Sequence, residues 1–154
     1  MDAITCVEMI EAVPGQHYPE FVAACDRALR PGGKVVMQVI NALAFNNPTA
    51  RNRRPRPLGT FVTTHIFPGQ QIPNLEFLHE AFLQSGKFER VYSECAAHDY
   101  ERTLRCWRMN LEANAGKFPP KMVRKYRYYL AFCEAGFATE LLHLSRVVFR
   151  KKDE

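Results

Sequence analysis

Two stretches of the sequence carry polar side chains that are suited to binding a ligand. Glu8 and Glu11 lie in VEMIEAV, at the end of the apolar run Ile4–Val7, and Gln38 lies near the end of the β-branched run Lys34–Ile40. Both runs are typical of buried strands. In open α/β sheets ligands bind beyond the carboxyl ends of the strands, so we expect a carboxylate and an amide to converge on one crevice.

A third stretch, YYLAFCEAGF at Tyr128–Phe137, mixes tyrosines, a cysteine and a carboxylate into an apolar helical run. It is open to two interpretations. In the first, the segment is an aromatic core helix with Glu134 turned toward water; in the second, its inner face belongs to a site. Positions three and four apart share a helix face, which here gathers Tyr129, Phe132, Cys133 and Gly136.

The elements that must position these residues predict an α/β fold. Apolar residues repeat at helical spacing from Tyr18 to Leu29, and Pro31-Gly32-Gly33 then ends the helix and turns the chain. Strand, helix, turn and strand make a βαβ unit with parallel strands. Further along, the pattern predicts helices over 75–85, 100–114 and 121–137, and strands over 88–95 and 144–150.

Composition favours one domain, because the chain has 154 residues, of which 47% are hydrophobic and 24% charged. No run approaches the roughly eighteen apolar residues of a membrane span, and residues 1–7 lack the pattern of a secretion signal. We therefore expect a cytosolic protein.

The cysteine pattern predicts neither disulfides nor a metal site. Five cysteines are spread along the chain without a CxxC pair. Cys95 and His98 have a C-x-x-H spacing, but no second ligand pair accompanies them. We expect no metal, and we expect His65 and His98 to be solvated imidazoles.

Positive charge is clustered, with a net charge of +5. Basic residues gather at Arg51–Arg56, Lys121–Arg127 and Arg150–Lys152. Such clusters attract nucleic acid or acidic phospholipid, or are simply solvated, and charge alone does not choose between these.

Five motifs taken together resemble the carboxyl-terminal half of the cyclopropane-fatty-acyl-phospholipid synthases, which belong with the mycolic acid cyclopropane synthases among the S-adenosylmethionine-dependent methyltransferases. Each motif alone is weak, but all five stand in the family's order over nearly the whole chain. They are VEMIEAV, RPGGKVVMQVI, HIFPGQQIPN, HDYERTLRCW and YRYYLAFCEAGF.

The resemblance implies part of a Rossmann-like class I methyltransferase sheet. The strands of this chain would be the fourth to the seventh, with the last antiparallel, and the first three strands and the glycine-rich cofactor loop would be missing. Residues 1–154 would form the carboxyl-terminal part of one methyltransferase domain, with 41–74 as a helical, lipid-facing insertion.

The resemblance also implies a reaction and its residues. The family transfers the sulfonium methyl of S-adenosylmethionine to a cis double bond of a phospholipid acyl chain, and bound bicarbonate takes the proton that is lost. Glu11, Gln38 and Tyr129 match catalytic positions, and these three with the backbone of Ile40 would bind bicarbonate. Gln38 departs from the family's usual His. Glu11 would be either protonated by burial or an acceptor for the bicarbonate O–H.

For the cofactor, the resemblance implies contacts from Val7 and Glu8, although some family members have Gly in place of Glu8. Phe67, Pro68 and Tyr100 would contact the lipid. The implied partner is a phospholipid acyl chain at an acidic membrane surface rather than nucleic acid, which makes the protein cytoplasmic and peripheral to the membrane.

A different class of function is a non-enzymatic one. Without the first three strands, Ile4–Val7 would be an exposed apolar edge that invites a homodimer or another chain. The rival hypotheses are a lipid-surface or interaction module, and a subunit completed by a separate amino-terminal chain.

Overall fold

The first half of the fold is a strand, a helix and a second strand that runs parallel to the first. A computed structural model describes residues 1–42 and 61–153. Strand β1 (Ala3–Val7), helix α1 (Tyr18–Ala28) and strand β2 (Lys34–Asn41) form the expected βαβ unit, with β1 and β2 parallel. At the turn before β2, Gly32 has a φ of 71°, a conformation that glycine adopts without strain.

The last strand lies in the middle of the sheet rather than at its edge. The strand order is β1-β2-β4-β3, and β4 (His143–Lys151) is antiparallel to both β2 and β3 (Phe88–Cys95). The expected α/β class and the antiparallel final strand are therefore confirmed. The strand ends predicted from the sequence differ from those observed by one residue at most.

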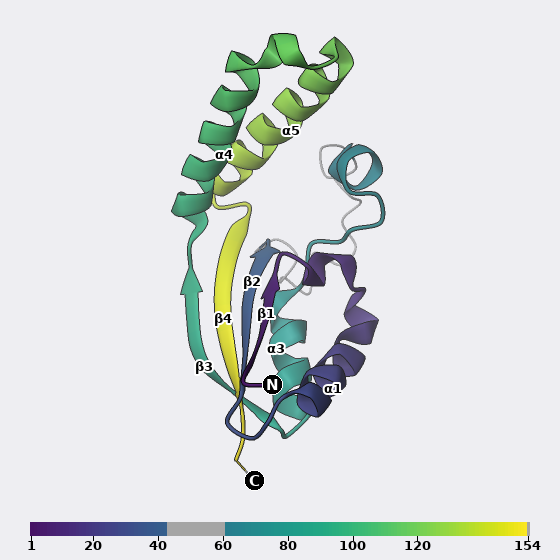
Figure 1. Cartoon of the computed structure of the whole chain (residues 1–154), viewed down its shortest axis with the longest axis vertical. Coiled ribbons are helices and arrows are strands. Elements are labelled where there is room, and N and C mark those ends of the chain that lie inside the picture. The colour runs from purple at the N-terminus through teal and green to yellow at the C-terminus, as the bar shows by residue number, and fades with distance from the viewer. Residues whose placement is uncertain (43–60, 154) are drawn as a thin grey trace.

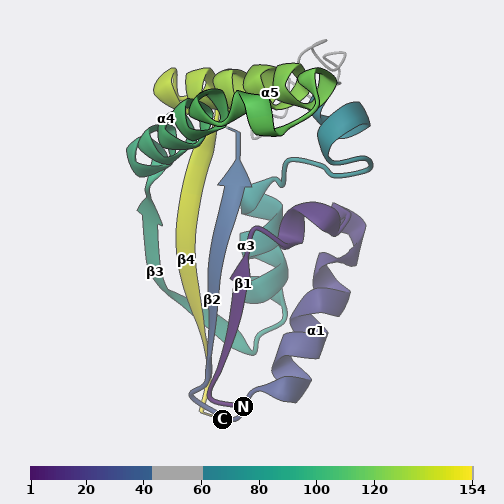
Figure 2. The ribbon, with the colours of Figure 1, turned by 45° about the horizontal axis from the view of Figure 1, so that its top comes forward.

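One face of the sheet is covered by α1 and α3 (Leu75–Gln84), as Figures 1 and 2 show. The core between these layers is aromatic: the rings of Phe82 and Phe149 stack with centroids 3.9 Å apart, and Phe88 meets Phe82 edge-on at 5.2 Å. This packing fixes the strands from which the polar site residues project.

A helical hairpin stands beyond the carboxyl ends of β1 and β2. Helices α4 (Ala97–Ala113) and α5 (Pro120–Ala138) pack side by side and project away from the sheet (Figure 1). The short helix η6 (Ala115–Lys117) joins them. In α5, Gly136 leaves room for the side chain of Leu142, because a Cβ there would lie 2.7 Å from Leu142 Cδ1. The close approach at this glycine is thus made by a side chain.

The second face of the sheet carries no described helix (Figure 2). Val36 and Tyr92 are exposed on that face, and β1 forms one edge of the sheet. This arrangement leaves apolar surface of the sheet open to solvent.

Only part of the expected insertion at 41–74 falls within the described residues. The basic cluster Arg51–Arg56 lies outside them. After residue 60, one turn of π-helix, η5 (Val62–Ile66), is followed by an irregular stretch that leads to α3.

Candidate functional site

The convergence of a carboxylate and an amide at the strand ends is observed, and the carboxylate is that of Glu8. Glu8 follows β1 directly with a left-handed φ of 50°, and its N–H donates to the carbonyl of Gln38 at 2.9 Å. Its Oε1 accepts a hydrogen bond from Gln38 Nε2 at 2.9 Å, and its Oε2 accepts one from the hydroxyl of Tyr100 at 2.7 Å. Three elements, β1, β2 and α4, therefore meet at one half-buried carboxylate.

The hydrogen bonds continue across the sheet to its far edge. Arg146 on β4 donates to Gln38 Oε1 at 3.2 Å and to Glu94 on β3 at 3.0 Å, and Tyr92 donates to Glu94. Both the oxygen and the nitrogen of the Gln38 amide thus have partners, and the bond to Glu8 uses one of the two N–H groups on Nε2. Arg146 was not singled out from the sequence; a charged residue inside the apolar run 144–149 was the available signal.

Glu11 is not part of this hydrogen-bond network and is more buried than Glu8. It lies in the short helix η1 (Ile10–Ala12) and is only 8% exposed. Its Oε1 accepts the N–H of Ile40 at 2.8 Å, whereas its Oε2 is buried and has no hydrogen-bond partner. Burial raises the pKa of Glu11, partly offset by the Ile40 hydrogen bond. The backbone N–H that was expected to contact bicarbonate is therefore already held by Glu11.

The inner face of α5 supplies aromatic walls. Tyr129 is part of an apolar cluster with Ile40, Tyr100 and Cys133, and its ring meets Phe67 edge-on at 5.8 Å. Burial raises the pKa of the Tyr129 hydroxyl, as it does for Tyr100, so both phenols are neutral hydrogen-bond donors.

The carboxylate of this helix, Glu134, is held by arginines. It accepts hydrogen bonds from Arg105 at 3.0 Å and from Arg108 at 2.8 Å on α4, so it ties the two helices together instead of simply facing water. The two interpretations of Tyr128–Phe137 are not exclusive: one face packs the hairpin, and Tyr129 on it also lines the site.

The residues expected to contact lipid divide into two groups. Phe67 and Pro68 are exposed in the turn after η5, and the N–H of Gln71 binds the carbonyl of Glu11 at 3.1 Å, which ties this stretch to the site. Tyr100 instead lies inside, where its hydroxyl binds Glu8 and its ring packs on Phe137 with centroids 4.9 Å apart. The family resemblance identified Tyr100 as a lipid contact, but sequence reasoning missed its hydrogen bond, because the partner is 92 residues away.

The residues expected to contact the cofactor lie at the open edge of the sheet. Val7 is 58% exposed at the end of β1, which leaves its backbone and side chain open to a ligand. The Glu8 carboxylate points instead to Gln38 and Tyr100. Val7 and Glu8 therefore lie together at the edge strand, and their contact with a cofactor stays a prediction.

Neither a metal cluster nor a membrane span is found within the described ranges. No group of three or more His, Cys, Asp or Glu side chains there is arranged to hold an ion, and no helix is long and apolar enough to cross a bilayer. Cys95, which the sequence spacing relates to His98, instead contacts His143, with 3.4 Å between Sγ and Nδ1.

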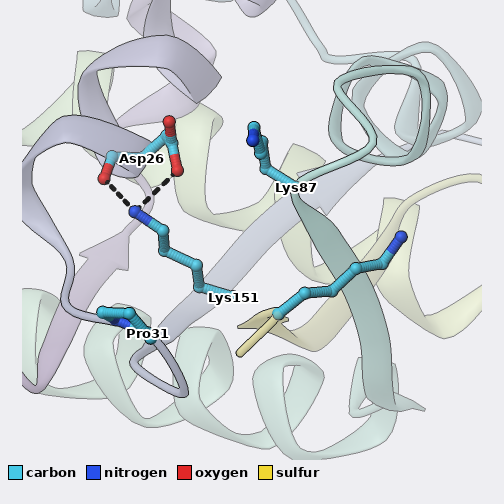
Figure 3. Close-up of a pocket in the computed structure, with 5 residues that line it drawn as sticks. Asp26, Pro31, Lys87 and Lys151 are labelled. Atoms are coloured by element: carbon cyan, nitrogen blue, oxygen red, sulfur yellow. Dashed lines mark hydrogen bonds and ion pairs between the residues drawn. The ribbon is translucent and has the colours of Figure 1, made fainter. Parts of the chain in front are cut away.

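A separate hollow lies at the opposite end of the sheet, where β2 begins and β4 ends (Figure 3). Asp26, Pro31, Lys87, Lys151 and Lys152 line it. Lys151 is bound by Asp26 at 2.7 Å and by two backbone carbonyls, so its charge is used to fasten β4 to α1. No residue of the predicted site lies there.

Comparison with known proteins places this geometry in a family. Residues 1–147 match the family described as mycolic acid cyclopropane synthetase. Tuberculostearic acid methyltransferase UfaA1 of Mycobacterium tuberculosis (strain ATCC 25618 / H37Rv) is 32% identical over 147 residues, which are 92% of this chain and 33% of that protein. A probable fatty acid methyltransferase of Pseudomonas putida is 28% identical over 153 residues, 96% of this chain and 37% of that protein.

Solved structures agree on the fold. The cyclopropane synthase MmaA2 from Mycobacterium tuberculosis superposes with a TM-score of 0.87 at 21% identity, over 98% of this chain and 55% of that one. Mycolic acid cyclopropane synthase CmaA1 complexed with SAH and CTAB gives 0.84 at 22% identity, with the same coverage. The fold is that of the class I methyltransferases, and the chain spans about a third to a half of the length of these relatives. By its match over residues 1–147, the chain belongs to the mycolic acid cyclopropane synthetase family.

Proposed function

We propose that this chain forms the carboxyl-terminal part of an S-adenosylmethionine-dependent methyltransferase that acts on the cis double bond of an unsaturated phospholipid acyl chain. The product would be a cyclopropane or a methyl-branched fatty acid. The single observation that carries the proposal is the buried carboxylate of Glu11, which has one oxygen fixed by Ile40 and the other without a partner. Such a group is costly unless it is protonated or binds a ligand, and perturbed carboxyls of this kind cluster at functional sites.

The cofactor would supply an electrophilic methyl group. In this chain Val7 and the turn at Glu8 would form one side of its site, and the other contacts would come from a part of the protein outside this chain. The family relationship and the relatives' SAH-bound structure support the choice of cofactor.

The reaction requires a base that can lie next to the carbocation on the acyl chain and remove a proton from it. Addition of the methyl group to the double bond leaves a positive charge on the acyl chain. A base then removes one proton from the added carbon, and the electron pair of the broken C–H bond closes the ring. We assign the base to a bound bicarbonate, which becomes carbonic acid, and we assign its retention to Glu11, Gln38 and Tyr129. The N–H of Ile40, which donates to Glu11, would position the Glu11 carboxyl instead of binding the ion.

Neutral Glu11 suits this role better than ionised Glu11. An ionised carboxylate would repel bicarbonate, whereas a protonated one donates its O–H from Oε2 to the anion. The raised pKa of Glu11 favours the protonated form. The phenol of Tyr129 adds a neutral donor, whereas the single O–H of Tyr100 is donated to Glu8. Both rings stabilise a cation without reacting with it.

The partner in this proposal is a phospholipid at an acidic membrane surface, met by a cytoplasmic protein that binds the membrane peripherally. Phe67 and Pro68 would contact the acyl chain, because they are exposed beside Tyr129. Nucleic acid is not part of the proposal, because the relatives of this chain include a probable fatty acid methyltransferase, which favours a lipid substrate.

A second candidate function follows from the open edge at β1. The chain would be a non-catalytic lipid-surface module, a homodimer formed through this edge, or a subunit that a separate amino-terminal chain completes. The exposed strand and the uncovered sheet face favour association in each case.

Calorimetric titration with S-adenosylmethionine separates these possibilities. The purified chain is titrated alone and after mixing with the amino-terminal half of a homologous synthase. We expect binding in the mixture, where both sides of the cofactor site are present. Binding by the chain alone would mean that it builds a cofactor site by itself or as an oligomer, and absence of binding in both would overturn the catalytic proposal in favour of the module.

A further inference from the structure

The end of the α4–α5 hairpin carries positive charge with no acidic residue among it. Residues 113–133 contain five Lys or Arg side chains and no Asp or Glu. Four of them are exposed, and three of these four, Lys117, Lys121 and Arg124, have no carboxylate within ion-pairing distance in the described part of the chain. The flanking acids are already engaged, because Glu112 pairs with Arg127 at 3.3 Å and Glu134 with two arginines of α4.

Two large apolar side chains are exposed among these cations. Phe118 is 40% exposed in the turn after η6, and Met122 is 39% exposed in the first turn of α5. Pro119 and Pro120 lie between Phe118 and Met122 and restrict the backbone there, so the turn holds both apolar side chains in a fixed arrangement. Helix α4 has 17 residues and therefore rises about 25 Å, so the turn at its end lies well away from the sheet (Figure 1).

A stripe of apolar and aromatic residues on α5 connects this end to the candidate site. Met122, Tyr126, Tyr129 and Cys133 follow one another at helical spacing, and the rings of Tyr126 and Tyr129 are 6.3 Å apart. Tyr129 in turn packs on Phe67 and on the cluster that holds Tyr100. An acyl chain drawn from a membrane at the hairpin end would therefore meet a continuous apolar surface.

We propose that the hairpin end, residues 117–124, is a membrane-docking element that binds an anionic phospholipid bilayer. Lys117, Lys121 and Arg124 contact lipid phosphates, and Phe118 and Met122 enter the boundary between head groups and acyl chains. This inference rests on the proposed function for its choice of lipid as the occupant, and it specifies the surface through which the substrate is reached.

The test is co-sedimentation of the full chain with vesicles, which requires no cofactor and no turnover. One set of vesicles contains phosphatidylglycerol and phosphatidylcholine in equal parts, and the other phosphatidylcholine alone. We expect binding to the anionic vesicles, weakened by salt, and little binding to the neutral ones. Lys121→Glu/Arg124→Glu should weaken binding by roughly 5-fold for each positive charge removed, and further for each negative charge added.

Matched controls separate this surface from net charge and general hydrophobicity. Arg27→Glu/Lys34→Glu makes the same change of charge at the opposite end of the molecule, and Leu83→Ser/Val91→Ser makes the same apolar loss as Phe118→Ser/Met122→Ser. Both control pairs should bind vesicles nearly as the wild type does. Equal losses in a control pair and its hairpin counterpart, or equal wild-type binding to neutral vesicles, would overturn the docking proposal.

The outcomes also distinguish this proposal from the proposed function. Methyl transfer to detergent-dispersed lipid without vesicle binding would overturn the docking element alone. Vesicle binding that the hairpin variants abolish, without any methyl transfer, would overturn the catalytic role and leave the docking element standing. If duplex DNA binds to the hairpin end and vesicles do not, the surface belongs to a different partner and the inference is wrong.

Discussion

Glu11 is the residue whose chemistry is set most strongly by its surroundings. The position of Glu11 after the first strand predicted a functional carboxylate. The burial of Glu11 and the hydrogen bond that it accepts from Ile40 agree with a role in binding a ligand. Position at the strand end did not by itself distinguish Glu8 from Glu11, and only the family resemblance assigned Glu11 to bicarbonate and Glu8 to the cofactor. Each lies near the end of β1, but the left-handed turn at Glu8 sends its side chain to Gln38 and Tyr100, whereas η1 turns Glu11 into the interior.

Replacing Glu11 should change how stability depends on pH. Because burial raises its pKa in the folded state above the ordinary value of 4.5, the folded protein holds a proton that the unfolded chain releases. The stability that Glu11 contributes in its protonated form is fully present below the unfolded-state pKa of 4.5. This stability is lost as the pH rises from there through the higher folded-state pKa. Glu11→Gln should remove this loss, so its unfolding temperature should fall less than that of wild type between acid and neutral pH.

Thermal unfolding across this pH range, with Glu80→Gln as the control, measures the difference. Glu80 is exposed on α3, so its substitution should leave the wild-type pH dependence intact. Parallel pH curves for wild type and Glu11→Gln would contradict the raised pKa.

The bond between Tyr100 and Glu8 joins the hairpin to the sheet and should be measurable in stability. Tyr100→Phe keeps the ring packing on Phe137 but leaves a half-buried carboxylate oxygen without its donor. We expect a loss of about 1 kcal/mol in the free energy of unfolding, measured with urea. Tyr92→Phe removes the same group from an exposed tyrosine and should cost less than about 0.5 kcal/mol. Equal costs would mean that the Glu8 bond is no stronger than a surface one.

Helices and strands could be predicted from the sequence where the residues that specify them lie close together in the chain. The βαβ unit was predictable because apolar spacing and Pro31-Gly32-Gly33 specify it within some forty residues. The antiparallel direction of β4 was implied only by the family resemblance, and its central place in the sheet was not predicted. Pairing between β2 and β4 joins residues more than a hundred positions apart, which no local pattern records. Within the site, Gln38 and Glu11 could be placed by strand-end rules, whereas Arg146 and the Tyr100–Glu8 bond depend on tertiary contacts that no local spacing records.

The turn between α1 and β2 makes a sharp prediction for a glycine. A Cβ at Gly33 would lie 2.9 Å from the carbonyl oxygen of Arg30 and 3.2 Å from that of Asp2, and neither backbone atom can move without disturbing β1 or α1. Gly33→Ala should lower the free energy of unfolding by about 1–3 kcal/mol. Gly116→Ala is the control, since nothing lies within 4 Å of a Cβ in that turn. Urea unfolding of both variants tests this, and a neutral Gly33→Ala would contradict the tight approach.

In the whole molecule, helices cover one face of the sheet and leave the other face open over the described residues, as in about half of the fold that the chain resembles (Figure 2). The β1 edge is also open in the described part, and a basic hairpin projects beyond the site (Figure 2). The chain spans 55% of the structures that it resembles, so the remainder of such a fold would cover the open face and supply the rest of the cofactor site. Activity in the proposed account is thus a property of the completed assembly, and the Glu11 site is this chain's contribution to it.

The most direct test is transfer of a labelled methyl group from S-adenosylmethionine to an unsaturated phospholipid by this chain completed with a homologous amino-terminal half. The account predicts label in the acyl chain with wild type and with the control Tyr128→Phe, and at least a 10-fold lower rate with Glu11→Gln although cofactor binding is retained, because proton removal depends on Glu11. Undiminished transfer by Glu11→Gln would contradict the central claim, as would the absence of transfer in a mixture that binds the cofactor.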